Sequence, residues 1–246
     1  MKTVLSLLFV IMVLHVFAQQ SRPVEFGIGL TTSMVRSDSV NEYMTQSNSA
    51  YGDLRLNRSF GLDASLKFHP LAYLKVGIVG SLDRSSISGP VEYSIVTSSP
   101  QDTLYGTGNA TAQLSSYSYG ITSDFVYSRL FFPEMEKSEL FLSAGLLRSH
   151  VFLRDRIYNP FWHNEFYNLN HLGVSWTYQL GLGYNYVVKN NDFIQTIGVQ
   201  LIYCGLRNSS LQSRVYGSDF DSEVQNPNIT AGMQSLGLQF SFGLAR

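Results

Sequence analysis

The segment LGVSWTYQLGLGYNY, residues 172–186, alternates large side chains with glycine or small polar ones. A period of two indicates an extended strand, because successive side chains of a strand point to opposite faces. One face is therefore strongly apolar and the other almost bare. The large residues of this segment are Leu172, Val174, Trp176, Tyr178, Leu180, Leu182, Tyr184 and Tyr186.

The same alternation recurs along the chain and predicts an even number of strands. Counting residues 172–186, eight segments show it, with the fifth the least regular. The other seven are 26–34, 60–68, 74–83, 117–128, 140–147, 197–204 and 236–244. The sequence thus predicts an all-β protein of eight strands.

The connections between these segments alternate strictly between long and short. The short ones are 69–72, 131–137 and 188–192, and the long, polar ones are 36–58, 84–112, 154–171 and 207–231. This layout predicts an antiparallel up-and-down barrel in one domain, with both termini on the short-turn side.

The apolar face of such a barrel points either inward, as in lipocalins, or outward into lipid. An eight-stranded barrel has an interior just wide enough for side chains to fill. The apolar rows hold too many large residues for that space, whereas the glycine, serine and threonine rows fit it. We therefore expect a transmembrane barrel, which also satisfies every backbone hydrogen bond within the bilayer. Aromatic residues near the strand ends favour an interfacial belt, namely Phe68, Tyr127, Tyr184, Tyr186, Phe240 and Phe242.

Composition and the N-terminus add limits on location and partners. The formal net charge of -1 argues against a nucleic-acid partner, and the single cysteine, Cys204, excludes an intramolecular disulfide. Lys2, an apolar run from Val4 to Val16 and a small residue at Ala18 predict a cleaved signal peptide at residues 1–18. The barrel domain is then residues 19–246. No cofactor is predicted.

A cleaved signal, eight alternating strands, long polar loops and the terminal strand LGLQFSFGLAR resemble the small outer-membrane β-barrels of Gram-negative bacteria, of the OmpA transmembrane-domain and OmpX type. The resemblance covers nearly the whole mature chain and implies outer-membrane localisation, contact with lipid and lipopolysaccharide, and insertion by the barrel-assembly machinery. That group includes anchors, adhesins, small pores and a few enzymes. The chain departs from it by ending Leu244-Ala245-Arg246 rather than in an aromatic residue.

Charged residues with inward parity suggest what fills the lumen. Asp63, Lys67, Lys75 and Asp124 occur on three consecutive predicted strands, the last three toward the periplasmic end. Unpaired buried charges are costly, so we expect these side chains to pair across strands and plug the lumen. The alternative is a gated path for small ions or solutes.

Arg148 and His150 continue an outward-facing row beyond its apolar part, at the outer rim. Cations there are expected to meet anionic lipid phosphates. A less favoured hypothesis makes His150 a base that activates Ser115 in a lipid A-modifying enzyme, but no carboxylate is evident to orient His150, so no catalytic residue is predicted. His163 and His171 are spaced too loosely to indicate a metal site.

The long loops carry many tyrosines and other aromatic residues, which dominate protein interfaces and predict a possible surface ligand there. The preferred interpretation is a membrane barrel with a structural or surface-interaction role and no catalytic activity.

Overall fold

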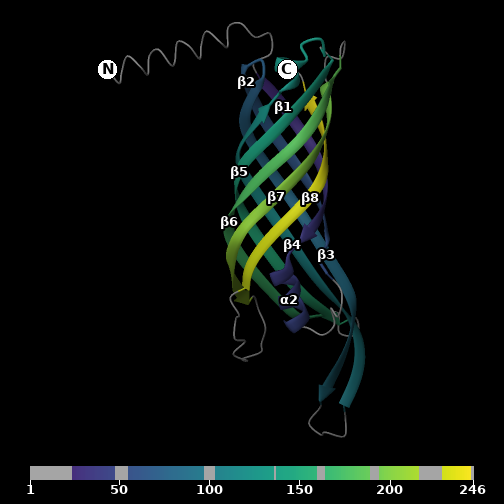
Figure 1. The fold of residues 1–246 in the computed structure, drawn as a ribbon. Coiled ribbons are helices and arrows are strands. Elements are labelled where there is room, and N and C mark those ends of the chain that lie inside the picture. Colours follow the sequence, from purple (N-terminus) through teal and green to yellow (C-terminus); the bar gives the residue numbers. More distant parts are fainter. Residues whose placement is uncertain are drawn as a thin grey trace, which may run out of the picture.

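A computed structural model describes residues 24–47, 55–96, 103–135, 137–159, 164–188, 194–215 and 229–244. They form a closed antiparallel barrel in which each strand pairs with its neighbours in sequence and β8 pairs with β1 (Figure 1). The predicted eight-stranded antiparallel barrel is confirmed. The strands are β1 (Val24–Arg36), β2 (Arg58–Leu71), β3 (Leu74–Val96), β4 (Thr103–Phe125), β5 (Ser138–Asn159), β6 (Asn164–Val187), β7 (Ile194–Val215) and β8 (Ile229–Leu244).

The large residues of the alternating pattern face outward. Leu180, for example, is 53% exposed although it lies in the middle of a strand, and the outward rows of all eight strands contain similarly exposed apolar residues. The opposite rows are buried and mostly small or polar, apart from residues such as Leu147 and Ile202, and Ser118 and Ser149 are hydrogen-bonded to each other at 2.6 Å inside the barrel. A closed barrel that is apolar outside and polar inside is suited to lipid, which is the arrangement expected from the sequence.

Two glycines allow strands to approach closely. A Cβ atom on Gly77 would collide with the carbonyl oxygen of Leu66 on β2, and one on Gly120 with that of Leu146 on β5. The small inward row is therefore needed for closure of the wall as well as for space in the lumen.

Strands β3 to β7 extend well beyond the segments whose alternation identified them. The expected loop at 84–112 is mainly a β3–β4 hairpin, paired as far as Val96 and Thr103 and projecting past the barrel (Figure 1). The loop expectation for this segment is wrong because only a strand inside lipid needs an apolar face. Outside the bilayer both faces can be polar, so backbone pairing continues without the sequence pattern.

Two helices occupy parts of the predicted connections. Helix α2 (Asp38–Ser47) lies in the expected loop 36–58, and α3 (Ser128–Phe131) begins after β4 has ended at Phe125. Tyr127 therefore lies at the N-terminal end of α3 rather than at the end of a strand as expected. No described helix is long and apolar enough to cross a membrane.

The start of β1 and the end of β8 lie at the end of the barrel that carries the short connections. This is the periplasmic end in bacterial outer-membrane barrels, and the end with α2 and the β3–β4 hairpin is extracellular. The expected signal peptide at residues 1–18 lies outside the described residues.

Candidate functional site

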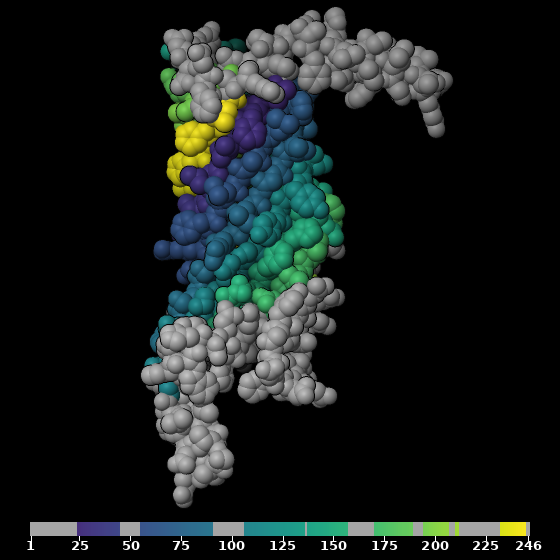
Figure 2. Space-filling view, turned by 180° about the vertical axis from the view of Figure 1, so that it is seen from behind, coloured from purple at the N-terminus to yellow at the C-terminus, as the bar shows by residue number. Residues whose placement is uncertain are grey.

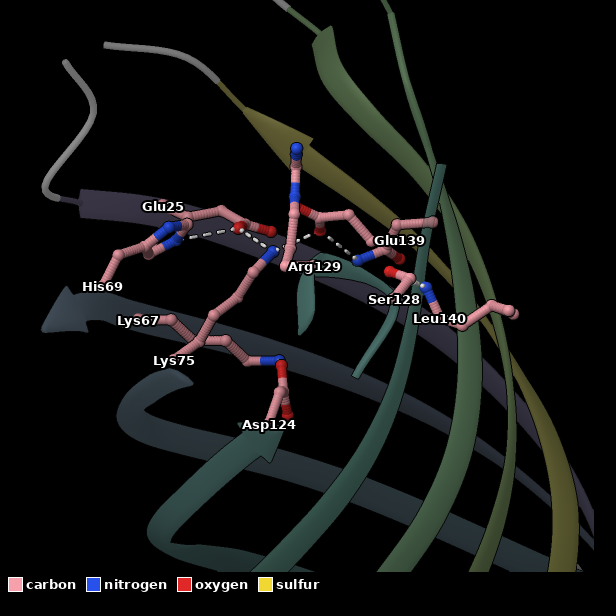
Figure 3. A network of polar contacts seen from close by, with 10 residues as sticks. Glu25, Lys67, His69, Lys75, Asp124, Ser128, Arg129, Glu139 and Leu140 are labelled. Carbon is pink, nitrogen blue, oxygen red and sulfur yellow. Dashed lines mark hydrogen bonds and ion pairs between the residues drawn. The ribbon is translucent and has the colours of Figure 1, made fainter. Parts of the chain in front are cut away.

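The periplasmic end of the lumen is crossed by a buried ion-pair network centred on Lys75. The Nζ atom of Lys75 lies 3.0 Å from Oε2 of Glu25 and 2.7 Å from Oε2 of Glu139. These residues come from β3, β1 and β5, so the contacts bridge the barrel interior (Figure 3). Lys75 is only 3% exposed, which means that its charge depends on both carboxylates for compensation.

Two further side chains with donor nitrogens, His69 and Arg129, enlarge this network. His69 Nε2 lies 3.2 Å from Oε2 of Glu25, and a guanidinium nitrogen of Arg129 lies 3.3 Å from Oε1 of Glu139 (Figure 3). Arg129 belongs to α3, which is fixed to β5 because the hydroxyl of Ser128 accepts a hydrogen bond from the backbone N–H of Leu140 at 2.9 Å. The short helix thus places the guanidinium group of Arg129 at the periplasmic mouth of the lumen.

Lys67 and Asp124 form a second pair beside this network, with 2.5 Å between Nζ and Oδ2 (Figure 3). The structure therefore brings these two predicted lumen residues together, across β2 and β4. It places Lys75, which was expected to join them, with Glu25 and Glu139 instead. Asp63 lies further along the lumen, away from this end. Its Oδ1 atom accepts a hydrogen bond from the Thr31 hydroxyl at 3.4 Å.

On the extracellular side of the ion pairs, the lumen contains a cavity of about 70 Å³. Its lining combines Asp63, Asp83, Cys204 and other polar side chains with apolar ones such as Leu147 and Ile202. Within the described part of the chain, no group of three or more histidine, cysteine, aspartate or glutamate residues is arranged to hold a metal ion. The cavity is large enough for a few water molecules.

The extracellular end of the lumen is occupied by α2. Its Val40 and Met44 are fully buried, and Leu56, after the helix, is buried beside them. Asn41 holds the returning chain because its Oδ1 accepts a hydrogen bond from the backbone N–H of Leu56 at 2.9 Å. This cluster includes inward residues of three strands: Ala110, Ala112 and Leu114 of β4, Val151 and Leu153 of β5, and Leu206 and Leu211 of β7.

A histidine contacts the side of α2. The Tyr43 hydroxyl lies 3.0 Å from Nε2 of His171, and the two rings meet edge to face at 5.2 Å between centroids. His171 is fully buried on β6, inward-facing and beyond the lipid-facing row that begins at Val174. Desolvation lowers the pKa of His171, which favours the neutral imidazole. No pattern in the sequence pairs His171 with the segment that forms α2.

The predicted outer-rim residues both lie against aromatic rings. Arg148 lies over the ring of Trp176, 5.2 Å from its centroid, and the His150 ring stacks on Tyr119 at 5.9 Å. Both side chains occupy the outward row of β5 and are partly exposed.

Ser115, the alternative nucleophile, is placed by other contacts. Its hydroxyl oxygen accepts a hydrogen bond from Nε2 of Gln113 at 2.9 Å, and Gln113 in turn accepts one from Arg84 at 2.6 Å. In the strand register Ser115 faces Phe152, whereas His150 faces Tyr117. Ser115 and His150 are therefore diagonal neighbours rather than direct partners.

Comparison with known proteins gives likenesses in fold. The sequence matches no known protein-family profile and no curated protein. Ail of Yersinia pestis, solved with the heparin analogue sucrose octasulfate, is 13% identical with a TM-score of 0.40 over 91% of this chain and 100% of that chain. Neisserial surface protein A is 11% identical, with a TM-score of 0.37 over 88% of this chain and 95% of that chain. A major outer membrane protein from Thermus thermophilus is 9% identical, with a TM-score of 0.45 over 89% of this chain and 98% of that chain.

The closed eight-stranded barrel and its lipid-facing apolar band make this chain a transmembrane β-barrel protein of the outer-membrane type.

Proposed function

We propose that this outer-membrane barrel does not conduct and that it acts at the cell surface, through the β3–β4 hairpin that projects beyond its extracellular end. The hairpin is here called the arm and comprises residues 86–96 and 103–113. The observation that carries the proposal is its open backbone edge. β2 pairs with β3 only up to Arg84, whereas the pairing of β3 with β4 continues to Val96. Among the described residues, the outer edge of β3 has no strand beside it over this length.

An open strand edge offers unpaired N–H and C=O groups to an extended segment of another molecule. Pro90 lies on this edge, opposite Asn109. A proline fits in an edge strand where its missing N–H would have faced solvent. Backbone groups two residues away, as at Ser88, then face the same open side, because strand geometry repeats every second residue.

The contacts at both ends of the lumen support the non-conducting part of the proposal. Ions entering from the periplasm would have to break the pairs of Lys75 and Lys67, and those entering from outside would have to displace Val40 and Met44. Both barriers lie inside a narrow barrel, where separating charges or opening an apolar cluster is costly. A path for small solutes would require both ends to rearrange.

The proposal includes no catalytic step. The stacking of His150 on Tyr119 and the hydrogen bond that Ser115 accepts from Gln113 support roles for both residues in packing at the barrel surface.

Adhesion of bacteria that display the protein tests the role of the arm. Replacing residues 91–108 by Asn-Gly should abolish binding to a panel of immobilised extracellular proteins and polysaccharides while leaving the barrel folded. Ser88→Pro should weaken binding by removing one edge N–H, whereas Ser88→Ala should retain it. Unchanged adhesion after arm shortening would refute the surface role.

Single-channel recording in planar bilayers tests the closed lumen. The folded protein should give no discrete steps, with a heat-sensitive gel shift as the check on folding. Steps whose size changes in Lys67→Ala would support the pore alternative instead.

A further inference from the structure

The outer part of the arm stands clear of the rest of the barrel. Ile87 still packs against the apolar cluster around α2, and Gly89, two residues on, is buried. From Pro90 outward, β3 pairs with β4 alone among the described residues, and β5 accompanies β4 only as far as Asn109. Within the barrel wall, by contrast, the strands from β1 to β5 lie against one another as oblique, contiguous bands (Figure 2). The free length of β3 is therefore residues 90–96.

Of the two strands of the free arm, β3 is better suited to pair with a further strand. Its residues 91–96 read VEYSIV, rich in β-branched and aromatic types, whereas the facing residues 103–108 read TLYGTG, with two glycines. Residues 86–96 and 103–113 together contain one charged residue, Glu92. Natural edge strands are commonly protected by charged side chains, lysine above all. A second arm would therefore meet little charge repulsion at this edge.

Strand direction decides how two copies of the arm can meet. β3 runs away from the periplasmic end, and the arm continues past the barrel roughly along its long axis (Figure 1). Two copies in one membrane therefore present parallel β3 strands, and the two strands of a parallel pair make different hydrogen bonds, so a two-fold axis cannot relate them. Two copies in facing membranes present antiparallel β3 strands, which exchange equivalent hydrogen bonds across a two-fold axis.

We propose that the free edge of β3 pairs with the same edge of a second copy in a facing membrane, which rests on the surface role proposed for the arm and names its partner. The two arms then form one continuous antiparallel sheet that joins two cell surfaces. Backbone hydrogen bonds supply the attraction, as in other cases of strand addition to an exposed edge.

The sequence of the edge limits the register of this pair. A two-fold axis at Pro90 would set two prolines opposite each other, without donors, and an axis at Glu92 would set two like charges directly opposite, which is destabilising. An axis at Val91 would pair Val96 with Ser86, at the level where the arm still contacts the barrel end. These three registers are therefore disfavoured.

An axis at Tyr93 avoids all three difficulties. It sets Glu92 opposite Ser94 and Pro90 opposite Val96, and it confines the pairing to the part of the arm that stands clear. Outward backbone groups recur at every second residue from Pro90, so Glu92 and Ser94 exchange hydrogen bonds on both sides of the axis.

The test mixes two populations of bacteria that have a truncated surface polysaccharide and display the full chain, each population with its own fluorescent label and epitope tag. Mixed aggregates are expected, and replacing residues 91–108 by Asn-Gly in one population should abolish them. Ser94→Pro in both populations should reduce them about tenfold, because each copy loses a central donor. Ser94→Ala keeps the donor and is the matched control. All variants should retain the heat-sensitive gel shift.

Single cysteines in a Cys204→Ser background test the register. Directly opposite residues of a non-hydrogen-bonded antiparallel pair have Cα atoms about 4.5 Å apart, within the range for a disulfide. Tyr93→Cys should therefore give a disulfide between differently tagged copies, which can form only between cells. Val91→Cys is the control, because its two copies would lie about 14 Å apart along the sheet and should not cross-link.

Mixed aggregates that persist after arm shortening, or equal cross-linking of Tyr93→Cys and Val91→Cys, would overturn the proposal. So would aggregates that need the protein on only one of the two populations. If unchanged cells form no mixed aggregates while their adhesion to immobilised molecules still depends on the arm, the second copy is refuted as the partner and the surface role stands. If neither depends on the arm, both fail.

Discussion

Leu180→Arg is the most direct test of the inside-out barrel. Leu180 lies near mid-height on β6 between Ala144 of β5 and Tyr203 of β7, and it is 53% exposed. An arginine on the lipid face at the bilayer midplane costs ~2–4 kcal/mol. Since 1.4 kcal/mol is a factor of ten, the folding equilibrium in lipid should fall by a factor of roughly 30 to 700. Urea titration of the protein refolded in phospholipid vesicles measures this change.

A control at another depth separates lipid exposure from any local effect of arginine in β6. Val174 belongs to the same outward row and is also exposed, but it is closer to the extracellular edge. Six residues on a tilted strand place it about 15 Å from Leu180 along the barrel axis. Val174→Arg should therefore cost only about 0–1 kcal/mol. Equal costs at the two positions would refute the lipid-facing assignment, because a water-exposed or inward row would show no such depth dependence.

The remaining predictions concern the contents of the lumen. Lys75→Met should cost about 3–5 kcal/mol in the same urea titration, because it leaves two buried carboxylates without their shared cation; a loss below about 1 kcal/mol would contradict the network. Cys204 should react slowly with a charged maleimide in the folded barrel, and Met44→Ala should accelerate labelling by loosening α2; fast labelling of the unchanged protein would disprove closure. The pKa of His171 is lowered below its ordinary 6.5, so the unfolded chain takes up a proton at a higher pH than the folded one does. The docking of α2 should therefore be fully stable above pH 6.5 and should weaken as the pH falls through the pKa of the folded state. Hydrogen exchange of residues 38–47 should show this, and His171→Gln should abolish the pH dependence.

The transmembrane part of the fold was predictable because the bilayer imposes a simple rule. Each strand inside lipid must alternate, as at 172–186, and the lumen must be narrow. These two constraints together give strand number, closure and the direction of each face. The same rule explains where prediction stopped, since the arm carries Ser86, Ser88 and Pro90 on a paired strand that no longer faces lipid.

Helix α2 lacked a comparable signal. Its apolar face consists of little more than Val40 and Met44, spaced four residues apart in a polar segment, DSVNEYMTQS. Such a short helix is marginal by itself and is stabilised by the wall that it contacts. The wall residues that α2 contacts, such as Leu114 and Leu153, lie outside the alternating sequence segments. The sequence pattern therefore indicated neither the helix nor the wall residues of the apolar cluster.

The lumen charges were predictable in kind but not in pairing. Glu25 and Glu139 have the same inward parity as Gly27 and Phe141, two residues further along each strand, yet each stands one position outside the alternating segment that defined its strand. Parity extended by a single residue would have included both. Pairing depends further on strand stagger, which a sequence pattern does not give. Lys75 is level with Asp124 in the register, but its long side chain crosses the lumen to Glu139 and Glu25. The Asp124 carboxylate is thereby left to Lys67, and the charges at this end of the barrel balance only when all the strands that carry them are in place.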